Sequence, residues 1–254
     1  MKPFEILLLY NLISFLVITA GLIFCKKVIR KDSLRDNVLK MVSILVVIIH
    51  MSSIYVDFFN NNGQAIIENN LILPIYPCNI VMWLLVIVAF MKNKESKLFK
   101  HVAEFTFIGG TLCGVIGVLF NINFLNNPDF KDYDILKGLL SHSVMIFGTV
   151  YIYLFKYIKL DVIRTTKSII FGLLMFTCIG LVINTLYRIF GLESVNAMFM
   201  ESNPFENLPF INFFTIGVFG VLLSFVGLNI YEIITLDKED RWITKIRKKV
   251  LNDV

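Results

Sequence analysis

Long apolar segments, separated by short polar loops, run through almost the whole chain. Seven of them have about 20 residues, the length that a helix needs to cross a hydrocarbon core about 30 Å thick. We expect seven membrane-spanning helices, over residues 4–24, 39–59, 71–91, 102–124, 135–157, 168–190 and 211–235. The pattern therefore predicts an all-α polytopic membrane protein, a seven-helix bundle within a single domain over residues 1–254.

The composition supports this fold class. Of the 254 residues, 57% are hydrophobic and only 17% are charged, and the mean hydropathy of +0.75 excludes an ordinary soluble domain. The first apolar segment is followed by Cys25-Lys26-Lys27 and not by a small-residue cleavage site, so we expect a retained helix and not a signal peptide. We expect a multi-pass protein of the cell membrane, most simply the bacterial cytoplasmic membrane.

The distribution of charge predicts the orientation of the bundle. The first, third and fifth loops and the carboxyl-terminal tail hold twenty of the 24 Lys and Arg residues, whereas the opposite loops are acidic or rich in Asn. Basic loops stay on the inner side of a membrane. We therefore expect the amino terminus outside and the carboxyl terminus inside. The same topology explains the net charge of +5 without a nucleic-acid partner.

The basic tail, residues 236–254, contains Trp242 among alternating basic residues. This pattern predicts a short amphipathic helix that lies at the inner interface on anionic lipid. We expect membrane lipids to be the partners of this protein. The sequence predicts no metal or cofactor, because its four cysteines and three histidines show no ligand spacing.

An unusual stretch opens the third segment, where Pro74 and Pro77 precede Cys78 and Asn79. Proline lacks a backbone donor and is tolerated at the first position of a helix. We therefore expect a helix to begin at Pro77, with Cys78 in its first turn, where unpaired amides and the helix dipole favour a thiolate. Residues 71–76 would then form a broken or re-entrant turn buried in protein.

Several polar residues are predicted to share the outer half of the membrane. With a rise of ~1.5 Å per residue, Cys78 and His142 lie ~20 Å and ~21 Å above the inner face. The same estimate places Asn184, Tyr55 and Asp57 between ~22 and ~25 Å. Intramembrane polar groups of this kind often mark functional sites.

Cys78 and His142 together suggest acyl transfer through a thioester. A catalytic cysteine needs a base and donors for the oxyanion, which His142 and the amides near Asn79 could supply. Other interpretations stay open. His142, between Ser141 and Ser143, could make a polar helix contact, and His50 could form a structural hydrogen bond with Asp57. Asn184 and Asn196 could cap or bridge helices, and Cys113 and Cys178 suit small buried apolar positions.

A different class of function also fits the polar layer. In a small-molecule transporter or binding protein, the same residues would form the substrate site, and the proline-broken third helix would resemble the discontinuous helices of transporters. The segments show no two-fold repeat, which favours the enzyme. An acyl hydrolase would use the same residues as a transferase.

Four short motifs resemble those of the YwaF-like family of bacterial integral membrane proteins, whose eukaryotic relatives include a transmembrane ether-phospholipid acyltransferase. They are Leu73-Pro74-x-x-x-Cys78, Ser141-His142-Ser143, Asn184 and Asn196-x-x-Phe199-Met200. The resemblance covers nearly the whole chain. It implies that Cys78 as nucleophile and His142 as general base move a fatty acyl chain from a phospholipid to a lysophospholipid without coenzyme A. Pro77 and Ala197 depart from the family pattern.

Overall fold

The computed structural model describes residues 3–60, 73–121, 124, 129, 131–203 and 212–252. Within these ranges the chain is entirely helical, with eight α-helices and one short 3₁₀ helix, η1. The helices are α1 (Pro3–Val28), α2 (Asp32–Asn60), α4 (Pro77–Phe90), α5 (Lys97–Leu119), α7 (Tyr133–Leu154), α8 (Val162–Ile189), η1 (Ala197–Phe199), α9 (Phe213–Thr235) and α10 (Trp242–Asn252).

Six of the α-helices are long and apolar enough to cross a membrane, namely α1, α2, α5, α7, α8 and α9. They correspond to six of the seven expected segments, and they confirm an all-helical, multi-pass membrane protein. The third expected segment, 71–91, forms the shorter helix α4, which has 14 residues and begins at Pro77. Residues 71 and 72 lie outside the described part. The count of seven spans and the orientation of the termini stay predictions.

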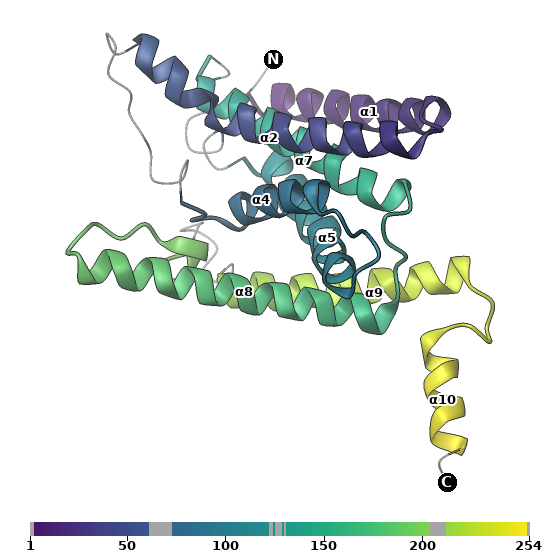
Figure 1. Cartoon of the computed structure of the whole chain (residues 1–254). Coiled ribbons are helices and arrows are strands. Elements are labelled where there is room, and N and C mark those ends of the chain that lie inside the picture. The colour runs from purple at the N-terminus through teal and green to yellow at the C-terminus, as the bar shows by residue number, and fades with distance from the viewer. Residues whose placement is uncertain are drawn as a thin grey trace.

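The long helices are arranged in layers. Figure 1 shows α1 and α2 on one side and α8 with α9 on the other, with α4, α5 and α7 between them. The contacts between helices agree, because α7 packs against α1 and α2 while α8 packs against α5 and α9. The central helices therefore form the protein core, and the outer layers carry many exposed Leu, Ile and Phe side chains that suit contact with lipid.

Small residues bring the central helices close together. Gly110, Gly114 and Gly117 of α5 follow one face of the helix, and a methyl group at any of them would overlap a side chain of α7. At Gly114 the nearest side-chain atom, from Ile146, would be only 2.5 Å away. Close helix packing through small residues is typical of membrane bundles, where dispersion forces and not water drive association.

Caps explain where several helices begin. The side chain of Ser96 accepts a hydrogen bond from the amide of Phe99 at the start of α5, and Asp161 accepts one from Arg164 at the start of α8. Such oxygens satisfy amides that have no partner within the helix. α4 differs, because Pro77 occupies its first position and its N-cap residue makes no side-chain cap.

Candidate functional site

Cys78 lies in the first turn of α4, as the two prolines predict. Pro77 has no N–H to donate, and the amides of Asn79 and Ile80 both donate to the carbonyl of Tyr76, at 3.0 and 3.4 Å. The thiol side chain is half-buried. The expected stabilisation of a thiolate at this helix start stays a prediction.

The residues just before α4 are not helical but are held by protein. Ile75 is only 2% exposed, and its carbonyl accepts a hydrogen bond of 2.8 Å from the amide of Met198 in the loop after α8. The ring of Tyr76 stacks on that of Phe199 with centroids 5.1 Å apart. For residues 73–76, the structure thus agrees with the expected irregular turn buried in protein, which can be tolerated at membrane depth only when other protein groups satisfy it.

Asn184 fastens the loop after α8 to that helix. Its amide nitrogen donates to the carbonyl of Ala197 at 3.2 Å, and its oxygen accepts from the Ala197 amide at 2.8 Å. The side chain is 7% exposed. In this position Asn184 bridges two parts of the chain, one of the two roles considered from the sequence. Its contact with Cys78 is indirect, through the loop that holds Ile75.

Asn196 organises the turn in which it lies. Its oxygen accepts from the amides of Glu201 and Ser202, both at 2.9 Å, and its nitrogen donates to the carbonyl of Ser202. Asn196, Met198 and Phe199 all have positive φ, a conformation that costs L-residues about 1–2 kcal/mol each. The loop beside Cys78 is therefore strained and is held by hydrogen bonds from both Asn184 and Asn196.

His142 has one ring nitrogen engaged and one left over. Nδ1 lies 2.7 Å from the carbonyl oxygen of Gly138, one turn earlier on α7. A carbonyl only accepts, so Nδ1 carries the proton and Nε2 keeps its lone pair. Within the described residues Nε2 has no hydrogen-bond partner. The ring lies directly against Gly117, where a methyl group would overlap it.

Two contacts set the register between α4 and α7. Both helices run antiparallel to α5, because Gly110 and Gly117 of α5 meet Thr149 and His142 of α7, while Gly110 and Cys113 lie near Val81 and Cys78 of α4. A methyl group at Gly110 would meet Val81 of α4 at 2.7 Å and also Thr149 of α7. A methyl group at Gly148 of α7 would meet Leu85 of α4 at 2.8 Å. These positions of α4 and α7 are therefore neighbours.

The register brings Cys78 and His142 to similar depth. Cys78 shares a face of α4 with Val81 and Leu85, since the spacing is i, i+3 and i+7. Cys78 comes three residues before Val81 and seven before Leu85, and the same steps back from Thr149 and Gly148 lead to positions 146 and 141 on α7. Cys78 therefore lies at a depth between these two positions, and His142 lies within ~6 Å of that depth. No hydrogen bond joins the two residues in the described structure, and their action as a dyad stays a prediction.

Asn79 links the thiol to a second histidine that the sequence did not connect with it. The thiol donates to Asn79 Oδ1 at 3.7 Å, and Asn79 Nδ2 lies 3.0 Å from His50 Nε2 on α2. The amide nitrogen must donate here, so His50 Nε2 accepts. Asn79 is 3% exposed, and it orients both groups. Its expected role at the oxyanion stays a prediction.

The remaining predicted residues lie on α2. Cys78, Asn79, His50 and His142 form what we call the Cys78 layer. Tyr55 is 69% exposed and makes no hydrogen bond with the described residues, so the structure does not join it to this layer. The backbone of Asp57 is part of α2, but its side chain, and with it the proposed bond to His50, lies outside the described part.

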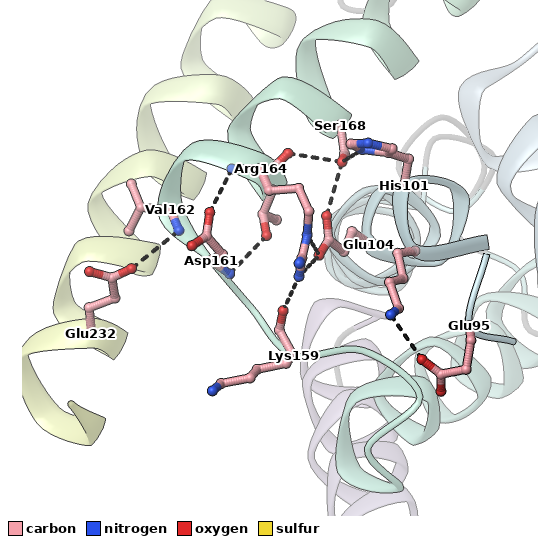
Figure 2. Close-up of polar contacts among 11 residues, drawn as sticks. Glu95, His101, Glu104, Lys159, Asp161, Val162, Arg164, Ser168 and Glu232 are labelled. Carbon is pink, nitrogen blue, oxygen red and sulfur yellow. Dashed lines mark hydrogen bonds and ion pairs between the residues drawn. The ribbon is translucent and has the colours of Figure 1, made fainter. Parts of the chain in front are cut away.

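A second polar cluster near the basic end of the bundle was missed in the sequence (Figure 2). Glu104 of α5 is fully buried and accepts from Arg164 Nε at 2.7 Å and from the Ser168 hydroxyl at 3.0 Å. His101 Nδ1 lies 2.7 Å from that hydroxyl. The one signal in the sequence is a carboxylate inside an apolar segment. Both oxygens of Glu104 are satisfied, so the cluster fastens α5 to α8.

A charged cavity of about 350 Å³ opens beside this cluster. Its walls carry three cations and three carboxylates, and their charges balance. The carboxylate of Glu232 is already used, because it accepts from the amides of Val162 and Trp242 at the starts of α8 and α10. Among the described residues, no group of three or more His, Cys, Asp or Glu could hold a metal ion.

Comparison with known proteins gives one result. The model of the TMEM164 family matches residues 1–231, which include all the predicted site residues and all but the last four residues of α9. No curated protein and no solved structure matches the chain.

Proposed function

The chain belongs to the TMEM164 family, and from this premise we propose that it is a membrane lipid acyltransferase that works through a thioester on Cys78. TMEM164 is a eukaryotic membrane acyltransferase family, which agrees with the type of reaction that the motifs suggested. The proposal adds that Cys78 is the nucleophile, that His142 is the base, and that the donor lipid reacts and leaves before the acceptor lipid is acylated. Its main support is His142 Nε2, which has no hydrogen-bond partner among the described residues and lies at a depth similar to that of Cys78.

In the first half of the reaction the Cys78 sulfur attacks the carbonyl carbon of a phospholipid ester. His142 Nε2 takes the thiol proton and then gives it to the departing lysolipid oxygen. The C–O bond breaks, an S–C bond has formed, and the acyl group is held as a thioester. The hydrogen bond to Gly138 keeps His142 in the tautomer that this role requires.

In the second half the hydroxyl of an acceptor lysophospholipid attacks the thioester. His142 Nε2 removes the hydroxyl proton and returns it to the Cys78 sulfur as the S–C bond breaks. The backbone amide of Cys78, in the first turn of α4, would donate to the oxyanion. The amides of Asn79 and Ile80 would have to leave the carbonyl of Tyr76, to which they donate at 3.0 and 3.4 Å, before they could contribute. Water in place of the acceptor would give hydrolysis by the same steps.

Intact-protein mass spectrometry tests the covalent step. Purified protein in detergent is incubated with a phosphatidylcholine of defined chains and no acceptor, and the acyl adduct is located by peptide mapping. We expect an adduct on Cys78 that hydroxylamine removes and that is absent from Cys78→Ser. Cys113→Ser is the matched control, because Cys113 packs against the same core. An adduct that survives Cys78→Ser, or that maps to another residue, would contradict the proposal.

A further inference from the structure

The last helix, α10, has a composition unlike that of the bundle. Its 11 residues include Lys245, Arg247, Lys248 and Lys249 and no Asp or Glu. Ile243 and Ile246 lie on one side of it and are 62% and 43% exposed. A short helix with an apolar side and a strongly basic remainder is typical of helices that bind membrane surfaces.

The start of α10 is anchored to the end of α9. The Trp242 amide donates to Glu232 at 2.9 Å, its indole N–H donates to Asn229 at 2.7 Å, and its ring packs edge-on against Phe225. Arg241 donates to two carbonyls at the end of α9. In Figure 1, α10 leaves this anchor and runs across the direction of α8 and α9, at the end of the bundle where the basic loops lie. A helix in this orientation lies along the membrane plane.

An isolated helix of this length is marginal in water. Beyond Trp242, the exposed Ile243 and Ile246 need a surface to cover them, and the basic residues need anions. We propose that α10 lies on the inner membrane surface and binds the phosphate headgroups of anionic phospholipids. The apolar side enters the interface while Lys245, Arg247 and Lys248 meet the headgroups. This site is separate from the Cys78 chemistry.

Two carboxylates compete with the lipid. Glu239 is ion-paired with Lys248, and Asp240 lies 3.8 Å from Lys245. The hydrogen bond and the charge of Lys248 lower the pKa of Glu239, so this pair is ionised at neutral pH. Exposed ion pairs contribute little, and phosphates can replace them. Arg247 has no ion-pair partner in the part of the chain that the structure describes, so it can bind a phosphate without first giving up a carboxylate.

Hydrogen–deuterium exchange on the full-length protein tests the proposal. The protein is reconstituted into nanodiscs of phosphatidylcholine alone or with phosphatidylglycerol, and exchange is followed in peptides from residues 242–252. We expect exchange to slow at least about tenfold with phosphatidylglycerol, and the effect to vanish in high salt. Arg247→Gln with Lys248→Gln should abolish the slowing. The matched control, Lys26→Gln with Lys27→Gln, removes two exposed cations at the same end and should keep it.

The competing carboxylates provide a test in the opposite direction. Glu239→Gln with Asp240→Asn should reduce the amount of phosphatidylglycerol needed for half-maximal protection by several-fold. Equal protection in both lipids would show purely apolar contact and overturn the proposal. Protection by inorganic phosphate added to phosphatidylcholine discs would show a site for free anions and would also overturn it. Unchanged exchange in α9 peptides verifies that each variant is folded, and unchanged Cys78 acylation verifies that the two sites are separate.

Discussion

The Cys78 layer and the Glu104 cluster are both polar sites among apolar helices, but they are built in opposite ways. Both oxygens of Glu104 have close partners, whereas the Cys78 sulfur has one weak hydrogen bond and His142 Nε2 has none in the described structure. Polar groups buried without partners cost free energy. The satisfied cluster therefore stabilises the fold, and the unsatisfied layer is the one with groups available for chemistry.

The largest effect, on the rate of Cys78 acylation, should come from substituting the histidine of the Cys78 layer, and the histidine of the Glu104 cluster gives the matching comparison. His142→Asn removes the proposed base, so we expect the rate of Cys78 acylation to fall at least about a hundredfold. The melting temperature should hardly change, because the ring makes one hydrogen bond to its own helix. His101→Asn is the counterpart and should lower the melting temperature while the folded protein keeps its acylation rate. If both variants lose activity equally, the division between the sites is wrong.

Glu104→Gln should mainly affect stability. It leaves Arg164 without its ionised partner, and breaking a buried pair costs about 3 kcal/mol, at the low end of the usual range because Arg164 is 37% exposed. Denaturation by sodium dodecyl sulfate in mixed micelles measures the change. Glu95→Gln is the control, since its pair with Lys100 is exposed and should contribute under about 1 kcal/mol. Equal losses from the two variants would show that burial of Glu104 is not the cause.

Asn184→Ala should have a smaller effect that reaches the Cys78 layer. It leaves the amide and carbonyl of Ala197 without partners, at a cost of about 1–3 kcal/mol. Because this loop holds Ile75, we expect acylation of Cys78 to slow several-fold as well. Thr177→Val on the same helix is the control, since its hydroxyl bonds only to its own helix. A stable variant with slow acylation would instead favour a direct role of Asn184 at the substrate.

The sequence predicted the features that depend on local chemistry. Apolar length marked all six long spans, and the missing donor of Pro77 placed the start of α4. The boundaries were less accurate. α2 begins at Asp32 and α8 at Val162, earlier than the expected 39 and 168. Apolar length marks only the part of a helix that suits the hydrocarbon, whereas the helix itself begins at its N-cap, which for α8 is Asp161.

Features that depend on pairing between distant residues could not be predicted. Glu104 and Arg164 lie 60 positions apart, so the sequence shows a lone carboxylate but not its partner. Likewise, depth along each helix put Cys78 and His142 in one layer, but only Gly110 and Gly148 fix the register of α4 on α7. The link from Asn79 to His50 depends on the packing of α2 against α4.

A third polar contact, between Tyr157 and Asp36 at the basic end, extends the comparison to groups outside the spans. Burial and the hydrogen bond to Asp36 raise the pKa of Tyr157 well above its ordinary value. Its contribution to stability is therefore complete below pH 10 and is lost as the pH rises, because the unfolded chain then ionises first. We expect wild type to lose about 1 kcal/mol from this residue between pH 10 and 11, as measured by detergent denaturation, and Tyr157→Phe to lack that component. An identical pH slope in the two proteins would mean that this satisfied pair, unlike Glu104, does not stabilise the fold.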